Sequence, residues 1–445
     1  MRMSDYRGVA DLVAAEIAAG RLGPGDRLPP QRDFAYARGI AVSTASRVYA
    51  ELARRGLVTG EVGRGTYVRS DLGAPQAMQS EPPPAALDLQ RTHSTLPEQE
   101  SALAEVLGVL ARNGAMGTAL NQYGPAGTPR ARSAAARFLA VDGFSPDPDG
   151  ILFTGNGRQA LAAALAALAL PGERIGCEPL TYPAVKGIAS RLGIALVPLA
   201  LDAEGVRPEA ILAAHRAAPL SGLYLQPTLH SPLGLTMGPS RRREIASVLA
   251  ATGLMAIEDG VYSFLADAVP LAACAPDRTI LVDSLSKRVM PGLTLGLIAS
   301  PRDWTDRLAA SVRQGGWSAT GVPLAAGVQW MSDGTAARLA LVKRADARAR
   351  QAIARAGLAG LQVGGDPAAY HLWLTLPESW RAEAFATAAL RQGVALTAAP
   401  AFAVHPGHAP NAVRLALAAP SRDDLARALA ILRRLALGGD EAVTD

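Results

Sequence analysis

Apolar residues recur at helical spacing at the start of the chain. The segment 4–19 has an apolar face made of Val9, Leu12, Val13 and Ile17. This spacing predicts an amphipathic helix. A break rich in glycine and proline follows at residues 20–30, and its last two prolines favour the start of a second helix, QRDFAYAR, ended by Gly39.

A third helix is predicted from Ser43 to Arg55. Its apolar positions lie on one face: Ala45, Val48, Tyr49 and Leu52. Two short β runs follow, at residues 57–60 and 66–70, separated by the Gly-rich segment EVGRG. Three helices followed by a small hairpin predict a winged helix-turn-helix over residues 1–70.

The next part of the chain changes character at residue 71. Residues 71–90 lack periodicity and contain three consecutive prolines, which predicts a linker stiffened by polyproline geometry. Beyond it, apolar runs alternate with Ala-rich helical segments: ILFT (151–154), RIGC (174–177), IALVPL (194–199), GLYLQP (222–227), LMAIED (254–259), TILVDS (279–284) and LGLIAS (295–300). Such runs indicate a sheet buried on both faces, hence a doubly wound α/β domain.

The last hundred or so residues are predicted to form a smaller part. After Arg313 the chain becomes helical, and it ends in a mixed section with AYHLWLTL (369–376) and VRLAL (413–417). We expect a small α+β subdomain there, over about residues 330–435.

Composition excludes several classes of protein. The longest unbroken apolar run has eleven residues, at 160–170, whereas a membrane-spanning helix needs about 20. The N-terminus has no apolar signal core. Two cysteines are too few for a disulfide framework, and six scattered histidines offer no metal site. We therefore expect a reduced, cytoplasmic protein without metal and without membrane contact.

Charge is concentrated in the first part of the chain. The first 70 residues contain 11 arginines, no lysine and 7 acidic residues, a net charge of +4, whereas the other 375 residues carry only +1. A compact basic module on a near-neutral body indicates a polyanionic partner. The alternative is a basic tail without a role.

The third helix offers a polar face opposite its apolar one. This face carries Ser43, Thr44, Arg47 and Glu51, side chains that suit base edges and phosphates. Arg32 begins the second helix, where it can pair with a phosphate. The hairpin tip, with Arg64 and Gly65, fits a wing that touches the minor groove. An oligomerisation module with exposed arginines is the alternative.

This segment resembles the GntR-type winged-helix domain in PGDRLPPQRDFA (24–35), STASRVYAELARRGLV (43–58) and GRGTYV (63–68). The resemblance implies that double-stranded DNA meets Arg32, Thr44, Arg47 and the wing around Gly65. The chain departs from the family at Ala41-Val42, where a Ser-Arg pair is common, so the operator sequence is not assigned.

Only three lysines are available for imine chemistry, which arginine cannot perform. Lys343 lies in a charged helical stretch and is predicted to be solvated, and Lys186 is predicted to lie on a surface helix. Lys287 directly follows an apolar strand, at the edge where open α/β sheets bind ligands. It is the candidate nucleophile; the alternative is a lysine that merely caps the strand.

The neighbours of Lys287 supply what pyridoxal phosphate needs. Asp259 ends a strand and suits pairing with the pyridine nitrogen, and Tyr262 suits a hydrogen bond to the phenolate oxygen. The segment FTGNGRQALAAAL (153–165) predicts a strand, a Gly-containing turn and a helix start. Such a turn presents N–H groups to a phosphate.

Together these residues resemble fold-type I aminotransferases over roughly residues 88–435. The matching pieces are YGPAGTPRAR (123–132), TGNGRQAL (154–161), EPLTYP (178–183), QPTLHSPLG (226–234), EDGVY (258–262), DSLSK (283–287) followed by PGLTLG, and NAVRLAL (411–417). The resemblance implies the following site residues: Lys287 as the Schiff-base lysine, Asp259 at the pyridine nitrogen, Tyr262 at the phenolate oxygen, Gly157, Arg158 and Ser284 at the phosphate, Tyr182 near the ring, Arg414 at a ligand carboxylate, and Tyr123 at a neighbouring subunit's phosphate site.

Two departures from the aminotransferase pattern affect the expected site. Ser231 stands where the family has asparagine before a proline, and Thr294 stands where it has a phosphate-binding arginine. We hypothesise that Arg158 supplies the missing charge.

A GntR-type head, a linker and an aminotransferase-like body (residues 91–435) resemble the MocR branch of bacterial regulators. The resemblance implies a head-to-tail homodimer in which each head reaches over the partner. It implies a regulator that senses pyridoxal phosphate, or an amine or amino acid that forms an aldimine with it. The alternatives are an aminotransferase with an accessory DNA-binding domain and a cofactor-free body used only for dimerisation.

Overall fold

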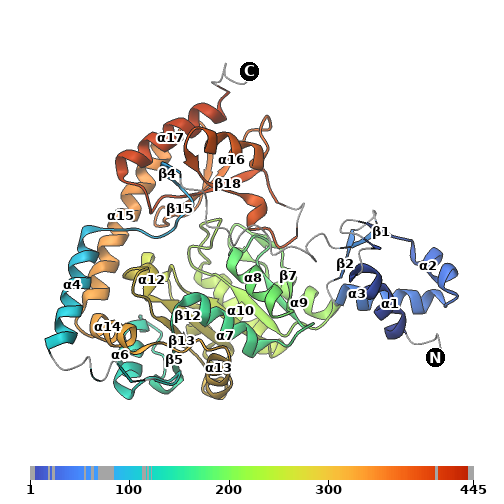
Figure 1. Cartoon of the computed structure of the whole chain (residues 1–445), viewed down its shortest axis with the longest axis horizontal. Helices are drawn as coiled ribbons and strands as arrows, with labels where there is room; N and C mark the ends of the chain where they lie inside the picture. Colours follow the sequence, from blue (N-terminus) through green and yellow to red (C-terminus); the bar gives the residue numbers. More distant parts are fainter. Residues whose placement is uncertain are drawn as a thin grey trace. The chain divides into compact units, whose positions relative to one another are not determined.

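The protein is described from a computed structural model. It describes residues 6–18, 21–22, 26–54, 57–61, 65–68, 85–112, 117, 120–121, 123–405 and 409–438. The chain divides into two compact units, one containing residues 1–81 and the other containing most of residues 82–445 (Figure 1). Within the described residues, no helix has the length and apolar character needed to cross a membrane.

The N-terminal unit has three helices and a three-stranded sheet. The helices are α1 (Tyr6–Ala18), α2 (Gln31–Arg38) and α3 (Val42–Arg54). The strands β1 (Arg27–Leu28), β2 (Val58–Glu61) and β3 (Gly65–Val68) pair antiparallel in the order β1-β3-β2. The predicted winged helix-turn-helix is confirmed. Strand β1 is an addition to the predicted hairpin.

The apolar faces predicted from spacing meet in the core of this unit. Its buried residues include Val9, Val13, Phe34, Ala45, Val48, Tyr49 and Leu52. Gly39 ends α2 in the left-handed conformation, with φ of 63°, which glycine adopts without steric cost. This tight end turns the chain directly into α3.

The C-terminal unit is built around a seven-stranded sheet. Its strands are β5 (Ile151–Thr154), β6 (Arg174–Cys177), β7 (Ala195–Pro198), β10 (Gly222–Leu225), β11 (Met255–Asp259), β12 (Thr279–Ser284) and β13 (Gly296–Ala299). They lie in the order β5-β13-β12-β11-β10-β6-β7. Each of the seven predicted apolar runs forms one of these strands.

The sheet is mixed, because β13 runs antiparallel to both of its neighbours, β12 and β5. Strand β12 ends at Ser284 and β13 begins at Gly296. A parallel crossover needs a dozen or more residues, usually with a helix that packs on the sheet. The short connection that carries Lys287 therefore returns the chain beside the strand it has just left.

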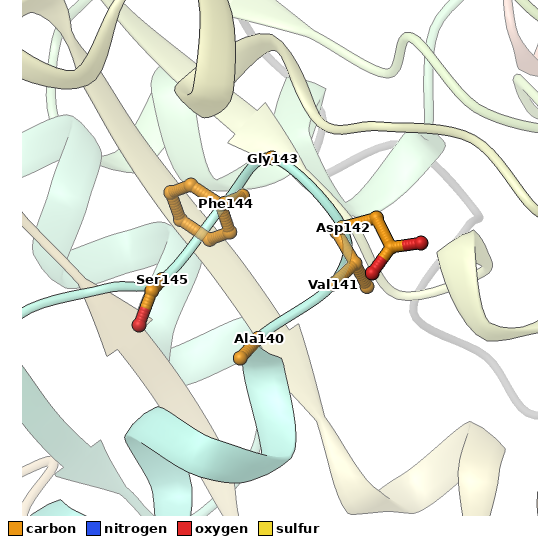
Figure 2. Close-up of a pocket in the computed structure, with 6 residues that line it drawn as sticks. All are labelled: Ala140, Val141, Asp142, Gly143, Phe144 and Ser145. Atoms are coloured by element: carbon orange, nitrogen blue, oxygen red, sulfur yellow. The ribbon is translucent and has the colours of Figure 1, made fainter.

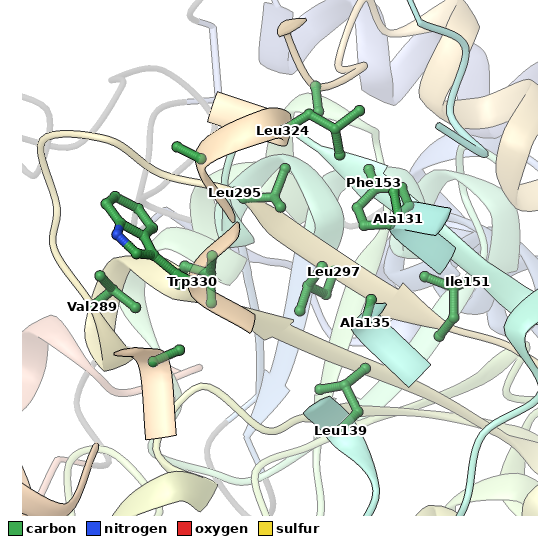
Figure 3. Packing of buried hydrophobic residues seen from close by; sticks show 14 of the residues in the cluster. Ala131, Ala135, Leu139, Ile151, Phe153, Val289, Leu295, Leu297, Leu324 and Trp330 are labelled. Atoms are coloured by element: carbon green, nitrogen blue, oxygen red, sulfur yellow. The ribbon is translucent and has the colours of Figure 1, made fainter. Parts of the chain in front are cut away.

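Helices flank this sheet. Those of the larger part are α4 (Pro97–Arg112), α6 (Pro129–Leu139), α7 (Gly157–Leu168), α8 (Pro183–Arg191), α9 (Pro208–Ala217), α10 (Pro239–Thr252), α11 (Leu271–Cys274), α12 (Leu285–Arg288), α13 (Arg302–Gln314) and α14 (Gly321–Ser332). Figure 3 shows apolar side chains of α6, α14, β5 and β13 in one cluster, which Val289 joins. Burial of this surface stabilises the region that carries Lys287.

A four-stranded sheet organises the smaller part. Its strands are β14 (Gln362–Gly364), β15 (His371–Thr375), β17 (Thr397–Ala398) and β18 (Ala412–Ala416), in the order β14-β15-β18-β17. The accompanying helices are α15 (Thr335–Gly357), α16 (Ala382–Arg391) and α17 (Arg422–Ala436). The predicted α+β subdomain is confirmed, with both predicted strand segments in its sheet.

Residues at the end of the predicted linker belong to this sheet-bearing unit. Strand β4 (Leu87–Asp88) pairs parallel with β16 (Val394–Ala395). The N–H of Leu89 donates to the carbonyl of Ala395, and the N–H of Ala416 donates to the carbonyl of Leu89. Residues 87–94, which we call the strap, therefore begin as an extra strand of the smaller part.

Candidate functional site

Lys287 lies on the short helix α12, directly after strand β12. Its Nζ donates to the Thr92 hydroxyl and, at 3.3 Å, to the Thr92 carbonyl. Burial disfavours the ammonium form and lowers its pKa to about 7, and the positive charges of Arg414 and Arg158 add to the effect. A lysine with such a pKa is a competent amine nucleophile near neutral pH.

Asp259 is the buried carboxylate at the end of β11. The Tyr224 hydroxyl donates to its Oδ2 at 2.7 Å, and the Val261 N–H donates to its Oδ1 at 3.2 Å. Burial raises the pKa of Asp259 to about 6. A buried carboxylate is stabilised by a cationic N–H partner, which is what a protonated pyridine ring offers.

Tyr262 lies near Lys287, near Asp259 and near Thr92 of the strap. The Lys287 Nζ is 5.5 Å from the centroid of its ring, and its phenol hydrogen-bonds to Thr92. Burial raises the pKa of Tyr262 to about 12, so the phenol remains a donor at neutral pH. The His371 ring packs beside it, with centroids 5.4 Å apart.

The turn from β5 into α7 has the geometry of an anion site. The Asn156 side chain accepts from the Gln159 N–H at 3.0 Å, and the first N–H groups of any helix lack intrahelical acceptors. A Cβ on Gly157 would lie 3.0 Å from the Cβ of Ser284. Glycine lets the helix start approach Ser284 without displacing it, which brings two predicted phosphate residues together.

Arg158 and Tyr182 are also brought together. The Arg158 Nε donates to the Tyr182 hydroxyl at 3.0 Å. Thr294, at the position of the expected arginine, donates its hydroxyl to the Gly155 carbonyl. The threonine therefore holds the backbone of the turn, whereas Arg158 is the nearby cation.

Arg414 projects from strand β18. Its Nη2 donates to the Gln90 carbonyl at 2.7 Å and to the Thr397 hydroxyl at 3.2 Å. Its Nε is buried without a hydrogen-bond partner. An unsatisfied buried guanidinium N–H is costly, and a ligand carboxylate would satisfy it.

The two remaining predicted residues have simpler surroundings. The N–H of Ser231 donates to the Gln226 side chain at 2.6 Å, at the carboxyl end of β10, and the following peptide bond to Pro232 is cis. Tyr123 is partly buried and packs against the apolar cluster of Figure 3.

These observations fit pyridoxal phosphate. A buried carboxylate is available to pair with a ring nitrogen, a tight helix start faces Ser284, and a guanidinium N–H lacks an acceptor. Lys287, Asp259 and Tyr262 are mutually close. The open hollow drawn in Figure 2, at residues 140–145, contains none of these residues.

Sequence reasoning missed several residues of this site. The strap residues Gln90 and Thr92 and the Asp259 partner Tyr224 carry no motif. Lys343 was predicted to be solvated, and this is wrong: its side chain is 1% exposed. The sequence did contain a sign of this burial: Lys343 lies four residues after Leu339 and four residues before Ala347, on the same apolar face of the helix.

The predicted DNA-reading side chains lie on two helices of the N-terminal unit. Arg32 is exposed on α2, and Ser43, Thr44 and Arg47 are exposed or partly exposed on α3. The Arg47 guanidinium lies 5.5 Å from the centroid of the Tyr6 ring. Glu51 was expected on the same polar face, but it is buried, beside Leu52 of the apolar face in sequence and one turn after Val48.

The wing begins at Gly65, with φ of +124°. This positive φ favours glycine, and the Arg27 Nε lies 2.7 Å from the position that a Cβ would take. Arg27 is exposed and adds a cation to the wing that sequence reasoning missed. Arg64, the predicted wing arginine, lies outside the described residues.

Comparisons with known proteins match both units. The family model "Bacterial regulatory proteins, gntR family" matches residues 5–68, and "Aminotransferase class I and II" matches residues 86–432. The HTH-type transcriptional regulator YdeF of Bacillus subtilis is 31% identical over 437 residues, covering 97% of this chain and 94% of the relative.

Two further matches bear on the aminotransferase-like unit. The "HTH-type pyridoxine biosynthesis transcriptional regulator PdxR" of Corynebacterium glutamicum is 28% identical, covering 64% of this chain and 63% of the relative. The α-aminoadipate aminotransferase LysN of Thermus thermophilus, solved with N-(5'-phosphopyridoxyl)-L-leucine, has a TM-score of 0.71 at 20% identity, covering 79% of this chain and 92% of that one. The fold is thus that of the pyridoxal phosphate-dependent class I and II aminotransferases. With its helix-turn-helix unit, the chain belongs to the MocR/PdxR-type regulators of the GntR family.

Proposed function

We propose that the protein is a transcription regulator whose effector is pyridoxal phosphate or an amine or amino acid that reacts with it. The exposed arginines on α2 and α3 support binding of double-stranded DNA by the N-terminal unit. The contacts around Lys287 support effector binding by the C-terminal unit. Such a regulator acts on chromosomal DNA, so we expect it in the cytoplasm.

Each residue of the site has a defined task. When bound, pyridoxal phosphate supplies an aldehyde, which joins an amine with loss of water, and an electron-withdrawing ring. Lys287 would provide the amine, Asp259 would hold a proton at the ring nitrogen, and Tyr262 would donate to the ring oxygen. Gly157 and Ser284 bind phosphate, while Arg414 pairs with a ligand carboxylate.

One observation carries the regulatory role. The Lys287 amine donates to Thr92, and the Arg414 guanidinium donates to the Gln90 carbonyl. Both partners belong to the strap, which follows in sequence the residues that join the two units. A ligand that binds the Lys287 amine and the Arg414 guanidinium breaks their hydrogen bonds to Thr92 and Gln90. Its binding therefore changes the state of the strap and shifts the population of linker conformations.

A footprint on operator DNA tests this proposal. We expect pyridoxal phosphate, or an amine added with it, to change either the DNA affinity or the length of the protected region. Identical footprints with and without ligand at saturating concentration contradict the regulatory role.

We also propose a head-to-tail homodimer in which each DNA-binding unit reaches over the partner and Tyr123 meets the partner's phosphate site. Two heads per dimer predict an operator with two half-sites. Light scattering of the free protein measures the mass, and a monomer at micromolar concentration contradicts this arrangement.

The grouping of Lys287, Asp259 and Arg414 also permits amino transfer. A lysine amine that titrates near neutral pH can move protons. A steady-state assay with an amino donor and a keto acid separates the two functions. Sustained turnover, together with a footprint that ligand does not change, favours an aminotransferase with an accessory DNA-binding domain.

Replacing Arg158 with alanine is expected to weaken pyridoxal phosphate binding roughly tenfold to hundredfold. A hydrogen bond to a charged group contributes about 1.5–3 kcal/mol, and no arginine stands at position 294. Titration with pyridoxal, which lacks the phosphate, should give the same affinity for both proteins. Tyr182→Phe is the control that removes only the hydroxyl bound by Arg158. Equal affinities of the wild type and Arg158→Ala for pyridoxal phosphate would contradict the hypothesis that Arg158 supplies the charge missing at Thr294.

A further inference from the structure

Lys343 is a buried lysine that the proposed function does not use. It lies on α15, and its Nζ donates to the carbonyl oxygens of Lys287 at 2.8 Å and Val289 at 3.0 Å. These carbonyls belong to the end of α12, where helical carbonyls lose their intrahelical partners. Lys343 thus binds the backbone of the residue that carries the reactive amine.

The rest of the turn is fixed from other sides. The Val289 side chain packs into the apolar cluster (Figure 3), and the Gln99 side chain donates to the Val289 carbonyl. The Tyr370 hydroxyl donates to the Lys343 carbonyl at 3.0 Å. The turn is therefore held by apolar packing and by two side-chain donors, of which only Lys343 is ionisable.

A charge is not needed to hold carbonyl groups. A neutral amide donates to a carbonyl without the cost of burying an ammonium. Burial lowers the pKa of Lys343 to about 7, and Asp346 on the same helix opposes this shift. The charge of Lys343 has an effect that a neutral amide would not have: it favours the neutral form of the Lys287 amine. This effect explains why a lysine, whose ammonium is costly to bury, stands at this position.

We propose that Lys343 is a positioning residue for Lys287: it holds the turn 287–289 through the Lys287 and Val289 carbonyl groups and places an ionisable amine on the backbone of the residue that carries the reactive amine. This inference rests on the proposed function, because it concerns capture of an aldehyde by Lys287. Lys343 contacts Lys287 directly through the Lys287 carbonyl oxygen.

Other charged groups also affect the protonation of the Lys287 and Lys343 amines. The Lys287 side chain also senses the positive charges of Arg414 and Arg158 and the negative charge of Asp259. His93 adds no charge near neutral pH, because burial and the neighbouring cations lower its pKa to about 3. Asp346 beside Lys343 is already bound by Arg350, Arg422 and Tyr370.

The test measures how fast pyridoxal phosphate labels the full-length protein at different pH values, with borohydride to fix the adduct. Labelling should rise as pH increases through about 7, because only the neutral amine reacts. Lys343→Gln keeps donors but removes the charge. We expect its midpoint to move up and its labelling rate at pH 7 to fall roughly twofold, because the Lys343 charge affects Lys287 less than the charges of Arg414 and Arg158 do.

Lys343→Arg is expected to act in the opposite direction. Its guanidinium stays charged throughout, whereas Lys343 loses its charge near pH 7, so the midpoint should stay or move down. Lys186→Gln, a change at the lysine that contacts Ala401, is the matched control and should leave the midpoint unchanged.

Each outcome is informative. Unchanged midpoints in both Lys343 variants, with a lower melting temperature only, overturn the proposal and leave Lys343 a structural clamp. If Lys343→Gln does not fold, a rise of the midpoint in Lys343→Arg overturns it as well. Absence of labelling in the wild type is different, because it contradicts the proposed function itself.

Discussion

Lys287→Ala is expected to lose all covalent capture of pyridoxal phosphate. The wild type should gain visible absorbance and one borohydride-fixed label per chain. The variant should gain neither, because its alanine has no amine and the arginines near this site cannot form an imine. The other two lysines lack its surroundings: Lys186 contacts the Ala401 carbonyl and Lys343 the turn backbone. Peptide mapping of the reduced adduct locates the label.

The same variant should retain DNA binding and lose its response to ligand. The arginines proposed to contact DNA lie in the N-terminal unit and are not altered. Lys186→Ala is the matched control and should behave as the wild type in both assays. Labelling of Lys287→Ala to the wild-type level contradicts the assignment of the reactive amine.

The double variant Arg32→Ala, Arg47→Ala is expected to lose DNA affinity roughly tenfold to hundredfold for each contact removed. An arginine at a base edge contributes about 1–3 kcal/mol, and a phosphate contact also reduces the salt dependence by about one ion. Both side chains are exposed and basic on α2 and α3. Operator affinity measured at several salt concentrations gives both quantities.

A charge-matched control keeps this result specific. Arg391 is exposed on α16 in the C-terminal unit, and Arg391→Ala removes one positive charge without touching the helix-turn-helix. It should leave DNA affinity unchanged. A double variant of Arg32 and Arg47 that binds operator as tightly as the wild type, with the same salt slope, would show that another surface contacts DNA.

Periodicity was sufficient to predict the three helices of the N-terminal unit and the seven strands of the large sheet. The stripe of Val9, Val13 and Ile17 and the alternation of strands and helices are local, because burial requires apolar residues at the period of the element. Lys287 and Asp259 could be placed for the same reason, since each stands at or directly after the end of a buried strand.

Long-range partners could not be predicted in this way. The contact of Thr92 with Lys287 joins residues 195 positions apart, and that of Gln90 with Arg414 joins residues 324 positions apart. No local pattern records such a pair. Lys343 shows the opposite error, because a charged side chain in a charged segment suggests solvent, whereas its place on the apolar stripe governs its burial.

The amino-acid sequence by itself determined the two-part architecture, the candidate amine and carboxylate at the sheet edge, and the exposed polar face of α3. These follow from spacing, charge and residue chemistry, which act over a few residues. Only the tertiary structure decided that β13 runs antiparallel, that the strap binds both Lys287 and Arg414, and that Lys343 donates to the Lys287 carbonyl. The physical reason is that packing brings distant segments together, and a hydrogen bond or a buried charge depends on what lies across the contact.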